Sequence, residues 1–135
     1  MSLHSKIKVN THYTRSVNLE RDKDSLDVVN AYIPTSRALR TLARIADTFH
    51  EDLAPRAWSL VGPYGSGKSS FSVFMAQLMS SPDDALQVAA HNVLANSDGN
   101  LAQRFAEATA RTHGYMKVLL TGAPEPLGRN CACTK

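Results

Sequence analysis

The stretch WSLVGPYGSGKSSF, residues 58–71, carries the most specific local pattern of this 135-residue chain. It contains G-x-x-x-x-G-K-[ST] in full: Gly62 and Gly67 are the spaced glycines, and Lys68 and Ser69 follow. This spacing is typical of loops that hold phosphate groups, provided that a strand precedes the loop and a helix follows it. The neighbouring sequence therefore decides how the stretch is interpreted.

Both flanks of the loop have the expected character. Residues 57–61, AWSLV, form a short and mostly apolar run, which predicts a strand. From Ser69 onward, apolar residues recur at steps of three and four, which predicts a helix. They are Phe71, Phe74, Met75, Leu78 and Met79. The order strand, loop and helix supports a phosphate-binding loop.

The loop has the chemistry that a phosphate chain requires. Gly62, Gly65 and Gly67 allow backbone conformations that side chains forbid, so that successive N–H groups can converge on an anion. The helix that begins near Lys68 adds unpaired N–H groups and the positive end of its dipole. We expect Lys68 to reach the β- and γ-phosphates, as binding and catalytic residue, and Ser69 to bind Mg²⁺. The predicted phosphate site comprises Gly62, Pro63, Tyr64, Gly65, Ser66, Gly67, Lys68, Ser69 and Ser70.

The rest of the chain reads as alternating strands and helices. Residues 7–19 alternate between apolar and polar side chains, which predicts extended strand, and residues 20–24 form a charged loop. A helix capped by Thr35 or Ser36 runs toward residues 54–55, and two more helices span about 83–96 and 100–113. Residues 115–121 are the next predicted strand.

This order predicts an α/β fold with a parallel sheet and crossover helices, incomplete because only two or three strands are present. We divide the chain into an N-terminal extended segment with a charged loop (1–30), a partial nucleotide-binding domain (31–128) and an unstructured tail (129–135). A sheet this short suggests a truncated domain, completed by another chain or by a missing C-terminal region.

Composition fits a globular domain outside the membrane. Hydrophobic residues make up 43% of the chain and charged residues 20%, and the formal net charge is +3. No apolar run approaches the roughly 18 residues of a membrane span, and the N-terminus lacks the apolar core of a signal peptide. The two cysteines lie among the last five residues, and the five histidines show no metal-ligand spacing. We therefore predict a cytoplasmic protein.

GPYGSGKSSF, led in by WSLV, resembles the Walker A motif of P-loop NTPases, and among them it is most similar to AAA-type ATPases. The upstream YIPTSRALRTLARI resembles the helix that precedes the first strand in such ATPases. The resemblance covers roughly residues 30–80. It implies a P-loop fold with ATP and Mg²⁺ as cofactors, and it nominates Tyr32, Ile33 and Pro34 as base or ribose contacts. Ordinary packing at the entry of the helix explains these three residues equally well.

One part of the family pattern is missing. AAA-type ATPases carry an apolar strand that ends in a carboxylate, which helps to hold Mg²⁺ and to activate water. Here the strand after the loop ends in Thr121 and Gly122, and no arginine finger can be assigned. The sequence therefore predicts nucleotide binding, and it leaves open whether the chain is an enzyme. Hydrolysis would need a base from outside these residues.

Three alternatives remain open. A small-molecule kinase is one, since GSGKSS also resembles kinase loops, although residues 83–113 offer only Arg104 and Arg111 for a lid. An ABC-type ATPase is another, but no LSGGQ-like signature follows. The third is non-enzymatic: a module that binds a partner or nucleic acid through the basic helix face of Arg37, Arg40 and Arg44.

Overall fold

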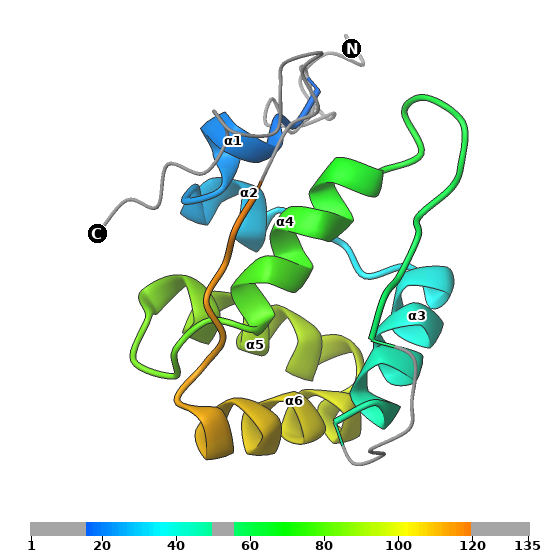
Figure 1. The fold of residues 1–135 in the computed structure, drawn as a ribbon. Helices are drawn as coiled ribbons and strands as arrows, with labels where there is room; N and C mark the ends of the chain where they lie inside the picture. Colours follow the sequence, from blue (N-terminus) through cyan, green and yellow to red (C-terminus); the bar gives the residue numbers. More distant parts are fainter. Residues whose placement is uncertain (1–15, 50–55, 120–135) are drawn as a thin grey trace, which may run out of the picture.

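A computed structural model describes residues 16–49 and 56–119 (Figure 1). Within these two ranges the chain forms helices and no strands. The helices are α1 (Leu19–Asp22), α2 (Leu26–Asn30), α3 (Ser36–Asp47), α4 (Lys68–Leu78), α5 (Ala85–Ser97) and α6 (Gly99–Thr112).

Helix α4 lies at the centre of the described structure (Figure 1). α1 and α2 pack against it from one side, and α5 packs against both α4 and α2. α6 forms an antiparallel neighbour of α5, to which it is joined at Asp98, and α3 packs against α6. The loop of residues 62–67 projects from the N-terminal end of α4, which leaves that end of the central helix accessible (Figure 1).

The core forms where the apolar stripes of these helices meet. Phe74 of α4 and Phe105 of α6 are its largest fully buried side chains. Tyr32 stacks on Phe74 with 4.3 Å between ring centroids, and Phe49 meets Phe105 edge to face at 5.4 Å. Aromatic pairs in these two geometries are favourable beyond the area that they bury. The stacking on Phe74 places the segment that leads into α3 beside the middle of α4.

Four predicted helices are present, but α3 ends at Asp47 and not at the expected residues 54–55. α3 begins after Thr35, whose hydroxyl accepts a hydrogen bond from the amide of Ala38 at 3.2 Å. α4, α5 and α6 start within two residues of the expected positions. α6 ends at Thr112 and is followed by His113 and Gly114, both with positive φ. A left-handed residue after the last turn is a common way to end a helix.

The predicted parallel sheet is wrong for the described residues. Residues 57–61 and 115–119 belong to no strand, and residues 120–121 of the second predicted run lie outside the described ranges. Of the predicted strand at 7–19 only residues 16–19 are described. Residues 16–18 form no strand, and Leu19 begins α1. The described structure is all-helical, so the expectation of an α/β fold is wrong. The predicted partner chain stays a prediction.

The reason is that an extended run becomes a strand only when a second run pairs with it. The two apolar segments pass different helices: the amide of Tyr115 donates to the carbonyl of Met79 at the end of α4, whereas the ring of Trp58 lies beneath Arg44 of α3. Leu60 and Val61 are exposed by 42% and 92%. Short apolar runs specify neither pairing nor burial.

The loop predicted at residues 20–24 is also wrong, because α1 covers Leu19–Asp22. The side chain of Asn18 accepts hydrogen bonds from the amides of Glu20 and Arg21, which is how an N-cap residue starts a helix. Asp22 is buried and accepts a hydrogen bond from the amide of Asn18 at 2.8 Å. These local contacts make a helical turn from a segment that looks like a solvated charge run.

Candidate anion-binding cavity

The glycine-rich loop turns back on itself before α4 begins. Gly65 and Gly67 have φ angles of 76° and 80°, in the left-handed region that glycine enters without steric cost. The amide of Ser66 donates to the carbonyl of Pro63 at 3.4 Å, which closes a tight turn. The loop therefore favours glycine at positions 65 and 67, of which the motif specifies only Gly67.

Gly62 is needed for a different reason, which is close approach. A Cβ atom at Gly62 would lie 3.0 Å from the hydroxyl oxygen of Ser66 and 4.0 Å from the side chain of Lys68. The first of these distances is tighter than ordinary van der Waals contact. The absence of a side chain at Gly62 thus lets Ser66 and Lys68 fold over the start of the loop.

The first turn of α4 presents unpaired backbone donors. Its N-cap is Gly67, which has no side chain to cap the helix, and the first turn holds no acidic residue. The amides of Lys68, Ser69 and Ser70 have no acceptor among the described residues. Such amides, together with the positive end of the helix dipole, attract an anion.

Lys68 is held by oxygen atoms of its own loop. Its ammonium group donates to the carbonyls of Gly62 at 2.9 Å and Pro63 at 2.7 Å, and to the hydroxyl of Ser66 at 3.2 Å. An ammonium group has three hydrogens, so all three are used. An incoming phosphate would therefore share the ammonium with these oxygens or displace one of them. The ammonium is already held beside the loop.

The loop lines a cavity of about 880 Å³ that also reaches α3. One part of its lining is apolar and includes Ile33, Leu60, Val61 and Phe71. Another part is polar and consists of the loop together with residues at the start of α3: Thr35, Arg37 and Thr41. The volume lies within the range of ordinary small-molecule sites, which combine apolar walls with a few convergent polar groups.

The charged residues of the cavity lining are Lys68 and Arg37, and no aspartate or glutamate among the described residues belongs to it. Two cations without a neighbouring carboxylate make the potential in the cavity positive. Asp84 and Asp98, which follow α4 in the sequence, have other structural roles. Asp84 caps α5 and lies 3.8 Å from Lys117, and Asp98 caps α6.

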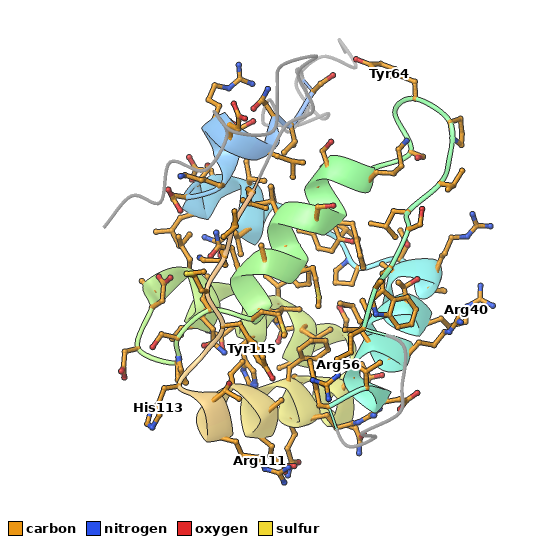
Figure 2. The ribbon with its side chains drawn as sticks, in the orientation of Figure 1. Arg40, Arg56, Tyr64, Arg111, His113 and Tyr115 are labelled. Atoms are coloured by element: carbon orange, nitrogen blue, oxygen red, sulfur yellow. The ribbon has the colours of Figure 1, made fainter. Side chains whose placement is uncertain are left out.

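The structure brings together every residue of the predicted phosphate site around this one cavity. They are Gly62, Pro63, Tyr64, Gly65, Ser66, Gly67, Lys68, Ser69 and Ser70. Tyr64 stands at the tip of the loop (Figure 2), and its hydroxyl is 3.2 Å from that of Ser16. This geometry does not test binding, so the roles of the nine residues remain predictions.

The residues nominated as base contacts are only partly brought to the cavity. Tyr32 and Ile33 line it, whereas Pro34 does not. Tyr32 also stacks on Phe74, so packing explains part of its role, and Ile33 is 73% exposed. Arg37 was not predicted as a cavity residue. The sequence indicates a basic helix face, but which of its arginines lines the cavity depends on how α3 packs.

The predicted metal ligand, Ser69, lines the cavity without a carboxylate beside it. No group of three or more His, Cys, Asp or Glu residues that could hold a metal ion occurs in the described ranges. Mg²⁺ in proteins is usually bound by one or two carboxylates together with phosphates of the substrate. The described residues therefore do not fit a resident Mg²⁺ site, and the ion would have to enter as a complex with the nucleotide.

No protein-family model matches the chain, and no curated protein or solved structure is significantly similar to it. Together with the absence of strands from residues 16–49 and 56–119, this overturns the assignment to the AAA-type ATPases and to a P-loop fold. The motif of residues 62–69 and the helix that follows it remain. None of the helices in the described part is long and apolar enough to cross a membrane.

Proposed function

We propose that the cavity binds a nucleoside triphosphate, with the phosphates over the loop of residues 62–70. The observation that supports this function is the joint placement of the whole loop, Lys68 and Arg37 around one cavity, with no carboxylate among its described lining residues. The unpaired amides of the first turn of α4 supply donors, and Lys68 supplies a fixed positive charge.

The apolar lining accommodates the uncharged part of the same ligand. Ile33 and Val61 line the cavity and are largely exposed, so a base placed there would cover apolar surface that now faces water. Burial of such surface is worth about 25 cal/mol per Å². A ligand with an apolar end and a polyanionic end matches this lining better than a simple inorganic anion.

The proposed function is binding rather than hydrolysis. Phosphoryl transfer to water needs a residue that orients the nucleophile and a metal held in place. The cavity lining provides Lys68 for charge stabilisation and hydroxyl groups such as that of Ser69, but no carboxylate from the described residues. ATP with Mg²⁺ is the probe for the test, because the sequence of the loop predicts these two cofactors.

Binding of a fluorescent ATP analogue with Mg²⁺ tests the proposal in wild type and Lys68→Ala. We expect the substitution to weaken binding at least about tenfold, because hydrogen bonds to charged groups are among the stronger ones. Lys23→Ala is the control: it removes the same charge from an exposed residue outside the cavity. Equal affinity of wild type and Lys68→Ala would reject the proposal.

The same assay separates the alternatives. Phosphate release into solution, or transfer to a small acceptor, would indicate an enzyme. Salt-dependent DNA binding that is lost when Arg37, Arg40 and Arg44 are replaced, without any effect of nucleotide, would favour nucleic-acid binding. The structure gives that alternative no specific support, because the three arginines are separated: Arg37 lines the cavity, Arg44 covers Trp58 at 5.3 Å, and Arg40 points away from the body (Figure 2).

A further inference from the structure

Arg37 reaches the cavity from a different helix than the loop does. It is the second residue of α3, and Thr35, Ala38 and Thr41 of the same helix end also belong to the lining. The cavity therefore has a wall formed by α3 and another formed by residues 60–71. A cation on the α3 wall extends the positive region beyond the reach of the loop.

The guanidinium of Arg37 is available for a ligand. It makes no hydrogen bond or ion pair with any of the described residues, whereas other arginines are engaged. Arg104 pairs with Asp47 at 2.5 Å, Arg21 pairs with Asp22 at 3.2 Å, and Arg44 lies over Trp58. The planar fork of a guanidinium suits two oxygen atoms of one phosphate group.

The side chain of Lys68 is held by hydrogen bonds, whereas that of Arg37 has none among the described residues, and this difference affects which ligands the cavity can bind. Lys68 is already held by three oxygens of its loop, so the phosphate nearest to it meets a fixed charge. Arg37 lies on the other wall with no such constraint. Both cations line the same cavity, so a ligand with several linked anionic groups offers a separate group to each of them, whereas a monophosphate offers one group.

We propose that Arg37 is a second ligand-binding residue of this cavity, which contacts a phosphate group from the α3 side and makes the site selective for polyphosphates over monophosphates. The inference rests on the proposed function, because it assigns a further residue to the same site. It also assigns the class of ligand: a chain of linked phosphates, with or without a nucleoside.

Arg40 provides a matched control on the same helix. It carries the same charge three residues further on, it is exposed, and it lies outside the cavity lining (Figure 2). Arg37 is exposed as well, so neither Arg37→Gln nor Arg40→Gln removes buried packing. Thermal unfolding of both variants should coincide with that of wild type, and it serves as the check that both are folded.

The experiment measures the affinities of ATP, AMP and inorganic tripolyphosphate for wild type, Arg37→Gln and Arg40→Gln by calorimetry at fixed salt. We expect Arg37→Gln to weaken the binding of ATP and of tripolyphosphate roughly tenfold or more. We expect Arg40→Gln to change it by less than about twofold, because Arg40 lies outside the cavity lining and donates to the carbonyl of Ser36 at 3.4 Å. The affinity for AMP should be nearly equal in all three proteins.

The outcomes are distinguishable. If Lys68→Ala abolishes ATP binding but Arg37→Gln behaves like Arg40→Gln, the role of Arg37 is refuted and the proposed function stands. If Arg37→Gln weakens AMP and ATP equally, the selectivity for polyphosphates is refuted. If wild type binds neither ATP nor tripolyphosphate, both the inference and the proposed function fail.

Discussion

Helices α4 and α6 begin in opposite ways. α6 begins after Asp98, whose carboxylate accepts a hydrogen bond from the amide of Leu101 at 3.0 Å. α4 begins after Gly67, which has no side chain, and the amides of its first turn have no acceptor among the described residues. The start of α6 is therefore satisfied within the chain, whereas the start of α4 is open to an anion from solution.

The other helices are like α6 in this respect. α1, α2, α3 and α5 each have a side-chain acceptor at the N-cap: Asn18, Ser25, Thr35 and Asp84. An N-cap side chain stabilises a helix by about 1 kcal/mol. Only α4 of the described helices lacks this contribution, and it is the helix whose start lines the cavity. The start of α4 therefore lacks this stabilisation, and its amides are left open to the proposed ligand.

The largest effect is expected from Ser69→Asp, which would give α4 an internal anion like that of α6. A carboxylate in the first turn of a helix is stabilising by about 0.3–1 kcal/mol, so the melting temperature should rise slightly. It would also occupy the open amides and repel phosphate, so that affinity for ATP should fall by at least about tenfold. Thermal unfolding and calorimetric titration measure the two quantities on the same sample.

The uncharged isostere Ser69→Asn is the control for this variant. It has nearly the shape of aspartate but no charge, so its affinity for ATP should lie much closer to that of wild type. A Ser69→Asp protein that binds ATP as tightly as wild type would show that the start of α4 is not the place where phosphate is held.

The smaller effect is expected from Asp98→Ala at the start of α6. Loss of this N-cap should lower the free energy of unfolding by about 1 kcal/mol, because the amide of Leu101 would lose its acceptor. Affinity for ATP should stay the same, since Asp98 does not belong to the cavity lining. Urea denaturation, monitored by circular dichroism, measures the free energy of unfolding. A marked loss of affinity for ATP in the folded variant would contradict the claim that the start of α6 contributes to stability alone.

Much of the helical structure could be predicted from the sequence. Apolar residues are spaced as in a helix in α3, α4 and α6, and Thr35 and Gly114 mark helix ends. These signals come from neighbouring residues and do not depend on how the helices pack. α1 and α2 were not predicted, although Asn18 and Ser25 are their N-caps in the structure. The dense charges of residues 20–24 favoured a loop. The shortness of both helices made the pattern hard to see.

The sheet could not be judged from local signals. Apolar runs at residues 57–61 and 115–119 are as compatible with unpaired extended chain as with strands, and only long-range pairing separates the two. Lys117 donates to the side chain of Gln77 at 2.7 Å, and this contact with α4 sets the course of the second run. Nothing in the sequence near Lys117 indicates it.

The candidate site, too, could be predicted only where it depends on local sequence. The motif located the loop, its glycines and Lys68, because their conformations follow from spacing and residue type. The contribution of Arg37 depends on the rotation of α3 against the loop. Arg37 and Arg44 are seven residues apart and share a helix face, yet Arg44 contacts Trp58 and only Arg37 lines the cavity.

Amide chemical shifts during a titration with ATP provide the most direct test of the central claim, that open amides at the start of α4 hold phosphate. With ¹⁵N-labelled protein, we predict large and saturable shifts for the amides of Gly65, Gly67, Lys68 and Ser69, and almost none for Gly99 at the start of α6. Tripolyphosphate should shift the same four signals. If they stay in place while ATP binds elsewhere, or if no signal moves at saturating ATP, the claim is contradicted.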